Sequence, residues 1–148
     1  MTLLEQARWF PGVHDLISLP PEEIRLPTGL VGRPVRRKWT TGSLAEFLAA
    51  LHDRSWVVPV ATVDRAGLGA DDTPERALLD YLGGGLPPLW NSRREGIRNV
   101  VLAGTVTGPG GIVVLTVEGA AKPRFQVIER LVTAVREILL IVPARKDR

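Results

Sequence analysis

Two runs of β-branched residues on either side of a glycine-rich turn constrain the fold of this chain more than any other feature of its sequence. Residues 100–107 and 112–118 are rich in valine, isoleucine and threonine, and residues 108–111 read Gly-Pro-Gly-Gly. Runs of this kind around a short glycine-containing segment are typical of a β-hairpin, here over residues 99–118. Both faces of the two runs are apolar, which favours a place inside a sheet over a place at its edge.

A third strand is predicted at residues 56–63, where several valines follow Trp56. Pro59 has no amide hydrogen for a strand ladder, which favours an edge strand or a bulged strand here. The expected fold class is α+β, with a small β-sheet, made of the hairpin and an edge strand, packed with about three helices. The spacing of apolar residues places these helices at residues 43–53, 74–82 and 124–140.

The three helices are signalled in different ways. Ser43 and Glu46 match a capping box ahead of leucines at helical spacing. Thr73 is expected to cap the second helix, with proline at its first position. Residues 124–140 show one polar and one apolar stripe, but their β-branched content leaves a strand open for residues 138–142.

Residues 1–36 contain five prolines with apolar residues between them. Each proline fixes its own φ angle and disfavours a helix at the residue before it. We therefore expect an extended, proline-rich N-terminal arm over residues 1–36, with a short helix near residues 3–8, ahead of a single α+β body over residues 37–148. The arm is too apolar for a solvated linker, so it must lie against its own body or a neighbouring subunit. Fully extended, it would reach on the order of 100 Å.

The chain is poor in residues that carry catalysis. It has no cysteine, which excludes disulfides, thiolate metal sites and thiol nucleophiles. Its two histidines, His14 and His52, are too few for a histidine-rich metal site. The glycine runs lack the lysine of a phosphate-binding loop. These features predict no cofactor, no metal and no enzymatic activity; the alternative is an enzyme with an unrecognised site, built on Asp71, Asp72 and His52.

The charge of the chain is mildly basic, with 19 basic against 16 acidic side chains and a net charge of +3. Such an excess is small for a dedicated nucleic-acid domain. No apolar run approaches the roughly 20 residues of a membrane span, so we expect a protein of the cytoplasm, or one assembled there into a virion. Few amides and many prolines fit a thermophilic host, and equally a GC-rich genome.

The leading interpretation is a non-enzymatic structural or assembly protein that self-associates or joins a larger protein shell, for example as a phage virion or capsid-stabilising component. Extended apolar arms tie subunits together in such assemblies. Aromatic residues and arginines are enriched where protein interfaces bind most tightly. The residues that we expect to contact a protein partner are Trp9, Phe10, Leu16, Ile17, Arg33, Arg36, Arg37 and Trp39.

The second interpretation is a small regulator that binds nucleic acid or a polymerase. Clustered arginines beside an aromatic side chain can hold phosphates and stack a base. The expected nucleic-acid contacts are Arg36, Arg37, Lys38, Arg93, Arg94 and Arg98.

Overall fold

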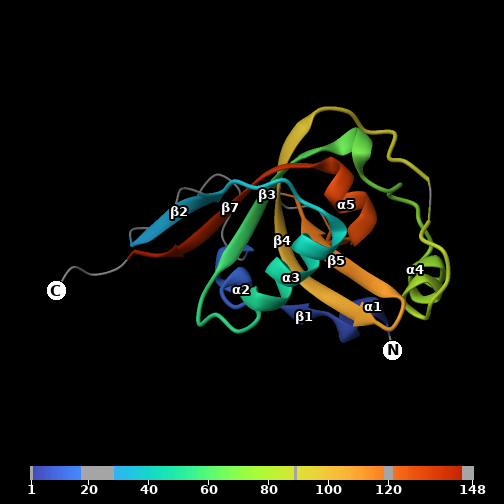
Figure 1. Cartoon of the computed structure of the whole chain (residues 1–148), viewed down its shortest axis with the longest axis horizontal. Coiled ribbons are helices and arrows are strands. Elements are labelled where there is room, and N and C mark those ends of the chain that lie inside the picture. Colours follow the sequence, from blue (N-terminus) through green and yellow to red (C-terminus); the bar gives the residue numbers. More distant parts are fainter. Residues whose placement is uncertain (1, 18–28, 89, 119–121, 145–148) are drawn as a thin grey trace.

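The fold is built on one antiparallel sheet of seven strands. The computed structural model describes residues 2–17, 29–88, 90–118 and 122–144 (Figure 1). The strands follow the order β2-β7-β3-β4-β5-β6, and β1 pairs separately with β4. Their bounds are β1 Arg8–Trp9, β2 Leu30–Val35, β3 Val58–Asp64, β4 Ile97–Gly108, β5 Gly111–Val117, β6 Arg124–Val127 and β7 Val135–Pro143.

Five α-helices and a 3-10 turn occur in the described parts of the chain. They are α1 Leu3–Gln6, α2 Val13–Ile17, α3 Thr41–Leu51, the 3-10 turn η2 Arg65–Gly67, α4 Glu75–Leu82 and α5 Ile128–Ala134. Helices α3 and α5 contact one another over the sheet, and α4 stands beside the turn between β4 and β5 (Figure 1). No helix among the described residues is long and apolar enough to cross a membrane.

Strand β4 is the central strand of the sheet, because it is long enough to pair with three other strands. Its first part, Ile97–Val101, pairs with β3, and its second part pairs with β5 along the predicted hairpin. Beyond the end of the β3 ladder, the two residues of β1 take the place of β3, with Arg8 opposite Thr105 and Trp9 opposite Gly104. The hairpin therefore lies inside the sheet, as its two apolar faces predict.

Two hydrophobic clusters hold the elements together. The larger joins the sheet to α3 and α5, with Leu44, Leu102 and Leu131 fully buried. The smaller joins α1 and α4 to the end of the β4–β5 hairpin, and includes Leu3 and Tyr81. At least 29 apolar side chains are buried in all, so removal of their surface from water is the main stabilising contribution.

The expected fold was wrong in the size of the sheet and in the nature of the N-terminal region. Residues 124–140, predicted as one helix, form β6, the short α5 and β7. Strand β7 pairs with β2 on one side and β3 on the other, so its β-branched residues are covered by partners distant in sequence. The strand that the sequence left open for residues 138–142 lies inside β7.

The N-terminal region is not an extended arm ahead of the body. Its described residues form α1, β1, α2 and β2, and Leu3, Phe10 and Val13 are at most 1% exposed. Of the described prolines, Pro11 lies between β1 and α2 and Pro34 lies within β2, and neither keeps the chain away from its own core. The remaining residues of this region, 1 and 18–28, lie outside the described part.

The helices α3 and α4 confirm two predicted helices, but neither has the predicted cap. The N-cap of α3 is Thr40, whose hydroxyl accepts from the Ser43 amide at 3.0 Å while the Ser43 hydroxyl accepts from the Thr40 amide at 2.9 Å. The N-cap of α4 is Pro74, and Thr73 instead donates its hydroxyl to the Ala70 carbonyl. The predicted strand at residues 56–63 is β3, which lies in the sheet interior and not at an edge.

Proline is tolerated in β3 because the β3–β4 ladder begins only after Pro59. Strand β4 pairs with β3 only from Val60 onward, so Pro59 has a strand neighbour on the β7 side alone. The register also shifts between Thr62 and Val63, which is the irregularity expected of a proline-containing interior strand.

Candidate functional site

The connection between α4 and β4, residues 83–96, carries the most unusual surface of the molecule. Four large apolar side chains are exposed among the described residues, and three lie on this connection or at its end: Leu86 at 90%, Trp90 at 63% and Ile97 at 45%. The connection runs along the outside of the molecule from α4 to the start of β4 (Figure 1). Large apolar side chains gathered on one exposed segment are typical of a binding surface.

The backbone around Trp90 is held in place by the loop after β3. The Trp90 carbonyl accepts from the Ala70 amide at 2.9 Å, and the Ser92 amide donates to the Leu68 carbonyl at 2.9 Å. Between the two loops lies a hollow of about 670 Å³. Its polar lining consists of Asp71, Asp72, Asn91, Arg93 and Arg94, and Trp90 also lines it.

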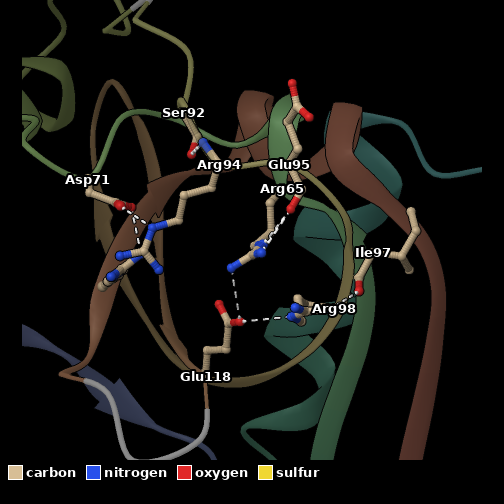
Figure 2. A network of polar contacts seen from close by, with 9 residues as sticks. Arg65, Asp71, Ser92, Arg94, Glu95, Ile97, Arg98 and Glu118 are labelled. Carbon is tan, nitrogen blue, oxygen red and sulfur yellow. Dashed lines mark hydrogen bonds and ion pairs between the residues drawn. The ribbon is translucent and has the colours of Figure 1, made fainter.

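The first ion-pair group ties this connection to the sheet through Asp71. Arg94 Nε lies 2.7 Å from Asp71 Oδ2 (Figure 2). Arg124 Nη1 lies 2.7 Å from Asp71 Oδ1. The Ser92 hydroxyl accepts from the Arg94 amide at 3.1 Å. One carboxylate therefore joins a residue of the connection to a residue of β6.

The second group is centred on Glu118, just after β5. Its Oε1 atom lies 3.6 Å from Arg65 Nη1 and 3.9 Å from Arg98 Nε (Figure 2). Arg65 also donates from Nε and Nη2 to the Glu95 carbonyl, at 3.2 and 2.8 Å. The hydrogen bonds from Arg65 to the Glu95 carbonyl hold the end of the connection, and each of the partly exposed ion pairs contributes at most about 1 kcal/mol to stability.

The structure separates the predicted basic residues into two groups. Arg94 and Arg98 belong to the ion-pair groups described above, and Arg93 is exposed with no ion pair among the described residues. Arg36, Arg37 and Lys38 lie on the link between β2 and α3, where the Arg37 guanidinium sits 5.1 Å from the Trp39 ring centroid and 5.8 Å from the Phe47 ring centroid. The nucleic-acid interpretation of these residues stays a prediction.

The residues predicted to contact a protein partner have different environments. Phe10 is buried, Trp9 is half-buried with its ring 4.4 Å from the His14 ring, and Arg33 is exposed on β2. Trp39 is half-buried and packs on Phe47. Leu16 and Ile17 belong to α2, and their side chains lie outside the described part.

Sequence reasoning missed a polar hollow of about 290 Å³ around His52, at the end of α3. His52 Nε2 lies 2.8 Å from Thr105 Oγ1, and the imidazole packs on the Phe10 ring at 4.5 Å. Burial lowers the pKa of His52 below its ordinary value of 6.5, the positive charge of Arg8 lowers it further, and Asp53 opposes both. No local signal connects His52 with Thr105, which lies 53 residues away.

The alternative enzyme site is not assembled as one constellation. His52 lines the hollow beside β1 and β4, whereas Asp71 and Asp72 line the hollow beside Trp90. No group of three or more histidine, aspartate or glutamate side chains placed to hold a metal ion occurs within the described ranges.

Comparison with known proteins gives a family but no activity. Residues 28–147 match the model of a family of unknown function (DUF6885), and the chain belongs to this family. No curated protein and no solved structure matches the chain.

Proposed function

We propose that the protein is a non-enzymatic interaction protein that self-associates through the connection between α4 and β4. The observation that carries this proposal is the exposure of Trp90, at 63%, on a segment that also exposes Leu86 and Ile97. Tryptophan and arginine are the side chains most enriched at the centre of protein interfaces. Long connections without helix or strand are frequently functional.

The way in which Trp90 is held supports a binding role. Its backbone is tied to Ala70, and the neighbouring Ser92 to Leu68, so these two residues are already held in place before a partner arrives. Ordering a flexible segment costs free energy on association, and a pre-ordered segment avoids that cost.

The charges around Trp90 fit a second copy of the chain better than a strongly charged partner. Arg93 contributes a positive charge and Asp72 a negative charge to the hollow beside Trp90, and neither makes an ion pair with the described residues. In a two-fold symmetric interface the same patch lies on both sides, so each patch must supply both signs. This mixed patch can pair with itself, whereas a purely acidic or basic partner would meet repulsion.

The proposal keeps the assembly role expected from the sequence but changes the surface. Leu3, Phe10 and Val13 are buried in the core of their own subunit, so the described N-terminal residues are less available to a neighbour. A place in a virion or in another larger shell stays a prediction.

The test is the native mass by light scattering after size exclusion, at several protein concentrations and moderate salt. We expect a discrete oligomer for the wild type and a shift to monomer for Trp90→Ser combined with Leu86→Ser. Leu4→Ser is the matched control, because Leu4 is 49% exposed on α1 and its variant should keep the wild-type mass. A wild type that is monomeric at every concentration would refute the proposal, as would an unchanged oligomer in the double variant.

A further inference from the structure

The hollow around His52 is a built site, separate from the surface proposed for self-association. It lies between α3 on one side and β1 and β4 on the other, with a volume of about 290 Å³. Its polar lining comes from Arg8, His52, Thr105 and Thr107, together with Gln6. Its apolar lining comes from Ala45, Leu48 and Ala49 of α3 and from Ile112.

The sheet register places Arg8 beside the two threonines. Arg8 is opposite Thr105 in the antiparallel β1–β4 pair, and side chains of opposite residues lie on the same face of a sheet. Thr107 follows two residues later on β4 and shares that face. A Cβ atom at Gly104 would lie 2.5 Å from the Arg8 carbonyl oxygen, so glycine is what allows β1 to approach this closely.

His52 forms a hydrogen-bonded wall of the hollow. Its Nε2 atom meets Thr105 Oγ1 at 2.8 Å, and its Nδ1 atom is buried with no hydrogen-bond partner in the described structure. A protonated imidazole would bury an unsatisfied N–H donor at Nδ1, which agrees with a pKa lowered by burial and by Arg8 despite the opposing Asp53. With its proton on Nε2, His52 donates to Thr105 Oγ1 and leaves the Thr105 hydroxyl free to donate into the hollow.

Arg8 gives the hollow a net positive charge. No carboxylate is among its lining residues, and Arg8 makes no ion pair within the described part of the chain. An arginine guanidinium with hydroxyl donors nearby is a typical receptor for a carboxylate or phosphate group. The alanines of α3 and Ile112 present methyl groups to whatever is attached to that anionic group.

We propose that this hollow binds a small organic acid, with its carboxylate on Arg8 and the hydroxyls of Thr105 and Thr107. Its short apolar chain lies against Ala45, Ala49 and Ile112. The volume is near the lower limit of small-molecule sites, roughly 300 Å³, so the ligand has only a few carbon atoms. The apolar walls favour such an acid over inorganic phosphate, which has no group to place against them.

The experiment is a titration of the full chain followed by backbone amide NMR shifts, with butyrate, acetate and inorganic phosphate as separate probes and chloride at matched ionic strength. We expect saturable shifts at residues 8, 52, 105 and 107 with butyrate, and weaker binding of acetate. Arg8→Gln should weaken butyrate binding by roughly tenfold, the effect of losing one charge-assisted contact. Thr107→Val keeps the side-chain shape and should weaken butyrate binding less than Arg8→Gln does.

Arg36→Gln is the control, because Arg36 is exposed on the link between β2 and α3 and should leave binding unchanged. Arg8 and Thr107 are both exposed, so we expect their variants to fold. The amide spectrum of each variant shows whether it does. The proposal is overturned by non-saturable shifts with butyrate, by Arg8→Gln binding like the wild type, or by phosphate binding more tightly than butyrate.

Discussion

Gly104→Ala tests whether the N-terminal segment is an integral part of the sheet. The new Cβ atom would lie 2.5 Å from the Arg8 carbonyl oxygen and 3.0 Å from both the Arg8 carbonyl carbon and the Trp9 Cα atom. All three are backbone atoms, so no side-chain rotation relieves the overlap. Ordinary contact begins at 3.4 Å, so β1 must retreat by about 0.9 Å.

This displacement affects β1, which is short and packs closely on β4. Strand β1 has two residue pairs with β4, and the Phe10 amide donates to the Ala103 carbonyl at 2.9 Å. Phe10 follows β1 directly and is 1% exposed. Adding a methyl group to a well-packed interior lowers the free energy of unfolding by about 1–3 kcal/mol. With an unfolding entropy of about 2.1 cal/mol/K per residue, this corresponds to a melting temperature lower by roughly 3–10 °C.

Thermal unfolding by circular dichroism measures the effect, with Gly42→Ala as the matched control. Gly42 lies in α3, and a Cβ atom there meets nothing within 4 Å. Alanine at that position should stabilise the protein by about 0.4–1 kcal/mol. The two glycine substitutions therefore have opposite expected signs. A Gly104→Ala protein that melts at or above the wild-type temperature would show that β1 does not pack on β4 as described.

Three further predictions concern the core, the titration of His52 and the ion pairs. Phe10→Ala should lower the free energy of unfolding in urea by about 3–5 kcal/mol, against a change within about 0.5 kcal/mol for the exposed control Leu4→Ala. Because the pKa of His52 is lowered in the folded protein, the unfolded chain takes up the proton first. The stability of the wild type relative to His52→Gln should be constant above about pH 6.5 and fall as the pH drops below it. Asp71→Asn weakens two ion pairs at once, so it should cost less than about 2 kcal/mol and lose its effect in high salt.

Each of these has a distinct contrary result. A Phe10→Ala protein as stable as Leu4→Ala would place the N-terminal segment outside the core. A stability difference between wild type and His52→Gln that is flat with pH, or that grows as the pH falls, would contradict a lowered pKa of His52 in the folded protein. A loss above about 2 kcal/mol for Asp71→Asn, unchanged by salt, would mean that the ion pairs are more than surface contacts.

Local patterns were enough for the hairpin and for two of the helices. The β4–β5 hairpin is encoded within about 20 residues by β-branched runs and a glycine turn, and its two apolar faces require neighbours on both sides. Helices α3 and α4 each show an apolar face at helical spacing, and both occur close to the predicted ranges. These features depend on residues close in sequence, so a sequence pattern can report them.

The C-terminal region shows where local patterns fail. Residues 135–143 fit a helical stripe and a strand almost equally, because apolar residues there occupy nearly every position. Residues 135–143 form a strand because they pair with β2 and β3. These two strands precede β7 by about 70 to 110 residues. Pairing partners at that distance leave no trace in the local pattern.

The candidate sites were even less accessible to sequence reasoning. Trp56 and Trp90 are the same residue type near the ends of elements, yet the Trp56 ring packs on Gly12 and Trp90 is exposed. His52 meets Thr105, and Asp71 meets Arg124, only after the sheet has formed. Residue types, turn signals and the absence of cysteine were evident from the chain itself. Burial, charge pairing and the convergence of polar groups in a hollow were decided by the tertiary structure, because each depends on distances between residues that the chain order does not contain.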